Sequence, residues 1–442
     1  MKKIPQEAKE AASRLMDFIA ASPTAYQACS EICERLEAAD FRQYTLSELK
    51  DLKAGDRGYY VKNGSALIAF VVGREPLAHG FHILGAHSDS PSLRIKPNCI
   101  SKKEGILRLT TEVYGGPILN TFFDRPLSLA GRVVLKSDNL FEPKVRLVDL
   151  EEPLLILPNL CIHMNREVNN GVKIERHKVL LPFVGLTDEE ADERWLHERL
   201  AEKLAVEAAD ILDFDLYVYE CQKPCFVGAD DSFISSGRLD NLAMAYAAVN
   251  GLIEAADAVG PGVQIALVTD HEEVGSNSKQ GAASAFVRDF LEALYLGLGA
   301  NRQQFLDLHD RSFMISADLA HAVHPNYDHF ADPDHRPQIN GGPVIKIAAS
   351  QAYATDAVSS AIFRSLCEAA EVPCQFFVNR SDLRGGSTIG PITSTLIPVS
   401  TVDVGTAIWG MHSLRETGGT LDVLYMDQLA ECFFTQSLQK EA

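Results

Sequence analysis

The feature that most constrains the fold of this chain is a repeated pattern in which a short apolar run ends in histidine or carboxylate residues. The run 81–86 is followed by His87 and Asp89, the run 263–268 by Glu272 and Glu273, and the run 313–317 by Asp318. Short runs rich in β-branched and aromatic residues are typical of buried strands. Because ligands of open α/β sheets collect beyond the carboxyl ends of the strands, we expect these side chains to meet at one sheet edge.

Two further places complete the pattern. The run 407–411 ends in His412, and Asp240 stands directly before a helical stretch that begins at Asn241. Taken singly, a histidine after a strand is more often an ordinary core or surface residue, and an aspartate before a helix is more often an N-cap. The recurrence at five places favours one shared site.

The chemistry of this set points to metal ions. The neighbouring carboxylates of Glu272 and Glu273 repel each other unless a cation neutralises one of them. Two imidazoles and three carboxylates, with no cysteine, suit a pair of Zn²⁺, Mn²⁺ or Co²⁺ ions bridged by one carboxylate. Such ions, ~3.5 to 4 Å apart, lower the pKa of a shared water and polarise a carbonyl, which is amide hydrolysis chemistry. Residues 271–275 lack a second histidine at the fifth position, which excludes the single-zinc helix motif.

Length and texture indicate two domains. The 442 residues exceed the roughly 250 to 300 over which one hydrophobic core keeps growing. Residues 1–92 and 235–442 alternate helices with apolar strands, and residues 6–40 read as helices broken at Ser22-Pro23. Residues 93–234 are rich in short strands and Gly or Pro turns, with a surface helix expected over 187–208. The expected fold is a discontinuous α/β domain with a mixed sheet flanked by helices, interrupted by an inserted β-rich domain.

Charge and composition argue against several classes of function. The 41 Lys and Arg against 60 Asp and Glu residues give a formal net charge of -19, which disfavours nucleic acid and anionic membranes as partners. The first residues lack the unbroken apolar core of a signal peptide, and no apolar run approaches the ~20 residues that span a bilayer. Nine scattered cysteines suit a reducing compartment better than a disulfide framework. We therefore expect a cytoplasmic protein.

The residues of the pattern stand within five motifs. In chain order these are GAHSDSP at 85–91, SGRLDN at 236–241, DHEEVGS at 270–276, SADLAHAVHPN at 316–326 and GMHS at 410–413. Two longer stretches, at 114–133 and 159–171, extend the match into the β-rich region. Together they resemble the aspartyl aminopeptidase family of cocatalytic zinc metallopeptidases, in order and across nearly the whole chain. The resemblance implies a metal-dependent aminopeptidase that removes N-terminal residues, preferably Asp or Glu, from peptides.

The resemblance also assigns roles residue by residue. Five residues match the ligands of two divalent ions, expected to be zinc with manganese or cobalt as alternatives: His87, Asp240, Glu273, Asp318 and His412. Asp240 would bridge the ions, Asp89 would orient His87, and Glu272 would be the general base. His163, in the inserted domain, matches a histidine that reaches the active site of a neighbouring subunit and can stabilise the oxyanion. The inserted domain would thus serve dimerisation, and dimers would form a hollow tetrahedral dodecamer.

Substrate preference depends on fewer residues. Lys346 matches the lysine that meets an acidic substrate side chain, although an ordinary solvated lysine is the simpler interpretation. Ala352 departs from the family, in which eukaryotic members usually carry arginine at this position. Relatives that favour neutral residues keep that preference open. A related two-metal carboxypeptidase or deacylase, and a shell protein in which metals only stabilise the fold, are the remaining alternatives.

Overall fold

The computed structural model describes residues 3–171, 173–187 and 194–436. Contacts divide the chain into two compact units. Unit 1 comprises Met1–Asp89, Pro224–Met411 and Glu416–Ala442, and unit 2 comprises Ser90–Lys223 and His412–Arg415. The sequence-based boundaries at 92/93 and 234/235 lie three and eleven residues after the first two of these divisions. The short return of the chain into unit 2 at 412–415 has no counterpart in the sequence-based division.

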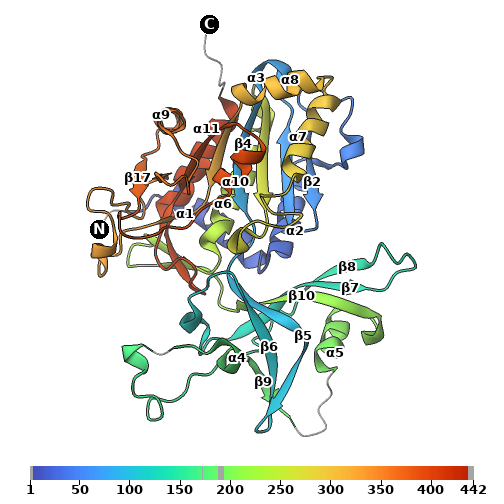
Figure 1. Ribbon diagram of the computed structural model, residues 1–442, viewed down its shortest axis with the longest axis vertical. Helices are drawn as coiled ribbons and strands as arrows, with labels where there is room; N and C mark the ends of the chain where they lie inside the picture. The colour runs from blue at the N-terminus through green and yellow to red at the C-terminus, as the bar shows by residue number, and fades with distance from the viewer. Residues whose placement is uncertain (1–2, 172, 188–193, 437–442) are drawn as a thin grey trace. The chain divides into compact units, whose positions relative to one another are not determined.

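Unit 1 is built on a nine-stranded mixed sheet (Figure 1). Its central strands β4 (Phe81–His87), β13 (Val263–Thr269), β14 (Phe313–Ala317) and β18 (Ser400–Gly405) run parallel. The flanking strands are β1 (Arg42–Gln43), β2 (Arg57–Lys62), β3 (Ala66–Val71), β16 (Val344–Ile347) and β17 (Gln375–Val378), of which β3 pairs antiparallel with β13 and β16 antiparallel with β18. The predicted α/β fold with a mixed main sheet is confirmed.

Helices cover both faces of this sheet, and the alternation of side chains along each strand explains why. Along β3, Leu67 and Ala69 belong to one core cluster, whereas Ile68 and Phe70 belong to the other. The first cluster is covered by α1 (Gln6–Ala21), α2 (Ala25–Ala38), α6 (Leu239–Ala255), α9 (Ala357–Ala369) and α11 (Thr420–Thr435). The second is covered by α7 (Phe286–Gly297), α8 (Arg302–Asp307) and α10 (Ile389–Leu396). A strand buried on both faces shows a continuous apolar run, as the sequence has here.

Shorter elements complete unit 1. Helix α3 (Pro76–His79) precedes β4, and two small sheets lie outside the main one. These small sheets contain β11 (Cys225–Val227), β12 (Phe233–Ser236) and β20 (Glu416–Gly419) in one, and β15 (Ala320–His321) and β19 (Ala407–Ile408) in the other. The predicted break near Pro23 separates α1 from α2, and the Thr24 hydroxyl accepts a hydrogen bond from the Tyr26 amide at the start of α2.

Unit 2 contains a separate six-stranded antiparallel sheet. Its strands, in spatial order, are β8 (Lys144–Asp149), β7 (Leu127–Leu135), β10 (Ile211–Glu220), β5 (Ser92–Lys103), β6 (Ile106–Tyr114) and β9 (Phe183–Leu186). Helix α5 (Trp195–Leu204) packs Leu196 and Leu200 into the core of this unit, and α4 (Arg176–Val179) is a single turn. The β-rich character of this region, predicted from its strands and turns, is confirmed.

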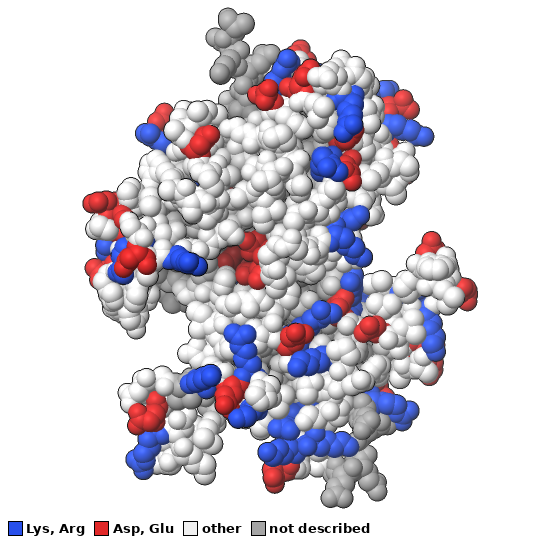
Figure 2. Space-filling view, viewed as in Figure 1, with Lys and Arg blue, Asp and Glu red and all other residues white. Residues whose placement is uncertain are grey.

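The surface helix expected over 187–208 is shorter than predicted. Helix α5 ends at Leu204, because Ala205 adopts the left-handed conformation with φ 53° that terminates a helix. Residues 188–193 of the expected helix lie outside the described part of the chain. Among the residues that the structure describes, no helix is long and apolar enough to cross a membrane. Acidic and basic side chains are interspersed over the face of the molecule seen in Figure 2.

Candidate active site

The parallel strands of unit 1 bring the predicted site residues to one edge of the sheet. His87 at the end of β4 pairs in register with Thr269 at the end of β13, so the segment that carries Glu272 and Glu273 leaves the sheet beside His87. In the strand on the other side of β4, Ser316 pairs with Gly85, and Asp318 follows two residues later. The convergence expected from the strand-end pattern is therefore present for these residues.

His87 is the buried centre of the cluster. Its Nδ1 lies 3.0 Å from the Asp89 carbonyl oxygen and 3.3 Å from Asp89 Oδ1. Its Nε2 lies 3.6 Å from Asp240 Oδ1 and 3.8 Å from Asp318 Oδ1. A metal-binding histidine commonly donates one ring N–H to a carbonyl or carboxylate while the other nitrogen faces the ion. The orientation of His87 matches that arrangement, with Nε2 directed toward the carboxylates.

Asp89 also fixes the segment after β13. Its Oδ1 accepts a hydrogen bond from the Glu272 amide and its Oδ2 one from the Glu273 amide, each at 3.1 Å. Just before this pair, the His271 backbone adopts φ 62°, which turns the chain sharply as it leaves the strand. One buried carboxylate thus contacts His87 and both glutamate amides. The sequence predicted the contact with His87 but not those with the two glutamates.

Asp240 is held from a different direction. It stands in the first turn of α6, and its amide donates a hydrogen bond of 3.0 Å to Glu416 Oε2. Both carboxylates are buried. Glu416 was not singled out from the sequence, since a glutamate three residues beyond the GMHS motif reads as an ordinary surface residue. The contact joins β20 to the start of α6 and makes Glu416 a positioning residue for Asp240.

The geometry fits divalent metal ions. Atoms of His87, Asp240 and Asp318 lie within 4.8 Å of one another, and so do atoms of His87, Glu272 and Glu273. Ligand atoms around one tetrahedral zinc lie about 3.4 Å apart, given bonds of ~2.1 Å. The separations of 3.6 and 3.8 Å from His87 Nε2 to the Asp240 and Asp318 oxygens are close to that spacing. Nitrogen and carboxylate oxygen donors are also those that zinc, manganese and cobalt accept.

Electrostatics lead to the same conclusion. Burial, reinforced by the surrounding carboxylates against the opposing effect of His87, raises the pKa of Glu272 to about 7. Burial and the nearby Asp240 carboxylate raise the pKa of Glu273 well above its ordinary value. So many acidic groups in one buried place repel one another, and a bound divalent cation would relieve that repulsion.

Lys346 lies beside this cluster rather than in solvent. The side chain on β16 is buried, and Nζ donates a hydrogen bond of 3.0 Å to the Leu319 carbonyl and lies 3.8 Å from Asp318 Oδ2. Burial opposes the charge on Lys346, but Asp318 together with Tyr353, Asp403 and Asp240 outweighs burial and raises the lysine pKa. In the opposite sense, Lys346 and His87 outweigh burial and hold the pKa of Asp318 at about 2. The interpretation of Lys346 as an ordinary solvated lysine is therefore wrong.

Two of the predicted site residues belong to unit 2. His412 is the first residue after Met411, the last residue of the preceding unit 1 segment, and its Nδ1 lies 3.1 Å from the Gly116 carbonyl oxygen. In both His412 and His87, Nδ1 therefore lies beside a backbone carbonyl oxygen, which leaves Nε2 as the nitrogen that could bind a metal ion. His163 lies in a turn in which the Asn165 amide bonds to the Cys161 carbonyl, and its side chain is exposed.

Comparison with known proteins identifies the family. Residues 18–434 match the family described as aminopeptidase I zinc metalloprotease (M18). A probable M18 family aminopeptidase 2 from Clostridium novyi is 46% identical over 417 residues, which cover 94% of this chain and 96% of the relative. A chain in the cryo-EM structure of the Ape4 and Nbr1 complex is 32% identical, with a TM-score of 0.93 over 98% of this chain and 87% of that chain.

A third comparison adds an assembled relative. The structure of the S. cerevisiae mApe1 dodecamer is 25% identical and has a TM-score of 0.82, with 96% of each chain covered. The extent of the family match and the identity to the Clostridium relative exceed what a shared fold alone would give. The chain therefore belongs to the M18 family and is a zinc metallo-aminopeptidase.

Proposed function

We propose that this aminopeptidase removes N-terminal acidic residues from peptides in the cytoplasm, using two divalent ions and Glu272 as the general base. The observation that carries the proposal is the position of Glu272, which shares a cluster with His87 and Glu273 and has a pKa near neutrality. A general base works best when its pKa lies near the operating pH.

Five residues would hold the ions: His87, Asp240, Glu273, Asp318 and His412. Asp240 would be shared between the two ions, since its carboxylate lies close to His87 while its backbone is held by Glu416. His412 is proposed from its imidazole and from the matching sequence motif. When bound, a pair of zinc ions would lower the pKa of a water molecule and polarise the scissile carbonyl.

The chain's own residues would then move the proton and hold the substrate. The Glu272 carboxylate accepts a proton from the attacking water and delivers it to the nitrogen of the leaving amine. Asp89 holds the backbone of Glu272 in place for this transfer through the amide hydrogen bond of 3.1 Å. His163 of a neighbouring copy would donate a hydrogen bond to the oxyanion.

Acidic specificity is proposed from Lys346. A substrate carboxylate that enters a buried site needs a cation, and Lys346 is a buried ammonium group next to Asp318. The absence of an arginine at Ala352 supports the second candidate, a preference for neutral residues such as leucine. The two candidates differ only in which N-terminal side chain the same site accepts.

Assembly is part of the proposal. The mApe1 relative forms a dodecamer, and the exposed position of His163 in unit 2 suits a residue that acts in a neighbouring copy. We propose that unit 2 serves dimerisation and that dimers form a tetrahedral dodecamer. Its hollow interior would admit unfolded peptides and exclude folded proteins.

The deciding experiment compares hydrolysis rates on Asp, Glu, Leu and Lys aminoacyl substrates and on N-blocked peptides. We expect Asp and Glu substrates to be cleaved fastest and N-blocked peptides not at all. Faster cleavage of Leu substrates would favour the neutral preference, and cleavage of N-blocked peptides would favour a deacylase or carboxypeptidase. Lys346→Met should lower the rate on Asp substrates more than on Leu substrates.

A further inference from the structure

The hairpin between β7 and β8 presents two apolar side chains to solvent. Leu140 is 91% exposed and Phe141 is 94% exposed. Their turn is ordered by its own hydrogen bonds, since Asn139 Oδ1 accepts from the Phe141 amide at 3.1 Å and the Asn139 carbonyl accepts from the Glu142 amide at 3.1 Å. We call residues 139–142 the hairpin tip. An ordered turn that holds a leucine and a phenylalanine outward is typical of a contact surface.

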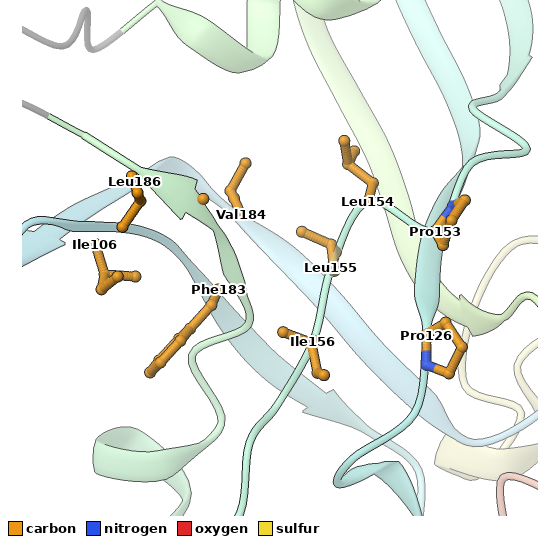
Figure 3. A pocket seen from close by; sticks show the side chains of 10 residues that line it. Ile106, Pro126, Pro153, Leu154, Leu155, Ile156, Phe183, Val184 and Leu186 are labelled. Atoms are coloured by element: carbon orange, nitrogen blue, oxygen red, sulfur yellow. The ribbon is translucent and has the colours of Figure 1, made fainter.

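A matching apolar cavity lies elsewhere in unit 2. It has a volume of about 460 Å³, and every residue that lines it is apolar or glycine, including Ile106, Pro126, Leu154, Ile156, Phe183 and Leu186 (Figure 3). We call it the socket. One wall is formed by Leu186 at the end of β9, and this side chain is 90% exposed. Another wall is formed by the segment around Ile156, and Ile156 forms an antiparallel bridge with Phe183. Binding sites for small metabolites usually contain a few precisely placed polar groups for orientation, and no polar side chain lines this socket.

The hairpin tip cannot fill the socket of its own chain. Pro126, which lines the socket, directly precedes β7, whereas the tip follows the other end of the same strand. The nine residues of β7 span about 30 Å at ~3.3 Å per residue. Both features belong to unit 2, so this separation is fixed by the strand itself.

We propose that the hairpin tip of one copy inserts Leu140 and Phe141 into the socket of a second copy. An apolar cavity of ~150 Å³ holds a benzene molecule, so a cavity of about 460 Å³ accommodates a phenyl ring and an isobutyl group. Tip and socket are different surfaces, so the contact is heterologous, and its repetition gives a ring of copies where the rotation between copies closes. The inference rests on the proposed assembly and names the surfaces that would form it.

The surface area that this contact would bury indicates which copies in the assembly it joins. An inserted phenylalanine buries ~150 to 250 Å², whereas a stable interface buries ~1,200 to 2,000 Å² in total. A single tip in a single socket therefore does not hold two copies together by itself. In a closed ring each copy is held by two such contacts and by a larger interface, so the tip connects dimers into the higher assembly.

The first experiment measures assembly by sedimentation velocity. The double variant Leu140→Asp with Phe141→Asp and the socket variant Leu186→Asp should each sediment as species smaller than the wild-type assembly. Leu306→Asp, at a position 45% exposed on α8 in unit 1, is the matched control and should assemble normally. All four positions are exposed, so loss of folding is not expected, and circular dichroism checks it.

Three results would overturn the inference. The first is normal assembly of the double tip variant. The second is loss of assembly in the socket variant alone, which would indicate that two sockets face each other. The third is a wild-type protein that sediments as a monomer. Peptidase activity is measured on the same samples. Wild-type protein that assembles through the tip but cleaves no peptide would refute the proposed function and leave this inference intact.

A crosslinking experiment tests the pairing directly. In the variant Phe141→Cys with Leu186→Cys, only a disulfide between copies joins chains into covalent oligomers, whereas a disulfide within one chain leaves the mass of the chain unchanged. Mild oxidation should join copies into covalent oligomers through a 141–186 disulfide, identified by mass spectrometry. Each single cysteine variant controls for the native cysteines, including the exposed Cys161. Absence of a 141–186 crosslink in fully assembled protein would contradict the proposal.

Discussion

The two units differ in how far their apolar residues are exposed to solvent. In unit 1 every residue of β3, β4 and β13 is buried, because helices cover both faces of the main sheet. In unit 2 the edge strand β8 leaves Val145 and Leu147 exposed, and this smaller unit carries more than half of the exposed large hydrophobic residues in the described part of the chain. Unit 1 has a core that is complete within itself, whereas the surface of unit 2 is typical of a protein that assembles.

The chemistry follows the same division. In unit 1, His87, Glu272, Glu273 and Asp318 follow strand ends and Asp240 stands at the start of α6. Asp89 holds the amides of the two glutamates, and Glu416 holds that of Asp240. Two more, His163 and His412, belong to unit 2. The comparison therefore separates residues that the buried sheet of unit 1 places from two unit 2 residues whose contribution to the site is proposed. Variants in each unit test whether this separation is real.

The largest expected effect comes from Glu272→Gln in unit 1. Loss of the proposed base should lower kcat by about 10³-fold, equivalent to about 4 kcal/mol, while zinc content stays at the wild-type value. Glu273→Gln is the matched control, since loss of a ligand should lower zinc content as well. Turnover is measured on a preferred substrate, and bound zinc by elemental analysis. Glu272→Gln protein with near-normal turnover would contradict the assignment of the base.

The next effect tests whether unit 2 acts in trans. His163→Ala should lower kcat by about 10²- to 10³-fold, since the side chain is expected to stabilise the oxyanion. If His163 acts in a neighbouring copy, coexpression of His163→Ala and Glu272→Gln chains should restore activity. A mixed pair has one intact site, so random mixing gives about a quarter of the wild-type sites. Mixed protein that stays inactive would show that both residues serve the same chain's site.

The sequence predicted the strand-end residues better than their supports. Runs such as 81–86 and 263–268 are continuous because both faces of the sheet are covered, so His87 and Glu272 could be placed at strand ends from the sequence alone. Family, enzyme class and fold class were predicted correctly. The burial of Lys346 and of Glu416 could not be predicted, because it depends on segments distant in sequence. The assignment of 412–415 to unit 2 is equally nonlocal.

A smaller effect is expected at Glu416, which supports Asp240 within unit 1. Glu416→Ala leaves the Asp240 amide without its acceptor, so the carboxylate loses its fixed position. Loss of such a supporting group typically lowers metal affinity 10- to 100-fold, equivalent to about 1.4 to 2.8 kcal/mol. Zinc affinity is measured by competition with a chelator. Glu416→Gln keeps a carbonyl acceptor and should recover most of the affinity, whereas equal losses in both variants would show that charge, not position, matters.

The last prediction uses the complete burial of the unit 1 sheet. His82 on β4 is fully buried against Phe433, with ring centroids 5.5 Å apart, and burial lowers its pKa to about 4. Between that value and the ordinary 6.5, the unfolded chain binds a proton that the folded protein does not, so stability falls as pH drops through this window. Between pH 7.5 and pH 5 the expected loss is about 2 kcal/mol.

His82→Leu should abolish that part of the pH dependence, because no imidazole remains to be protonated. The unfolding free energies of variant and wild type are measured by urea titration at each pH, and their difference is compared. Because both proteins contain the same metal ligands, the effect of protonating those ligands cancels in the difference. His177→Leu, at an exposed position in unit 2, is the control and should leave the pH dependence as it is. An unchanged pH dependence in His82→Leu would mean that the sheet admits a charged imidazole. The difference in burial between unit 1 and unit 2 would then be smaller than the burial of β4 indicates.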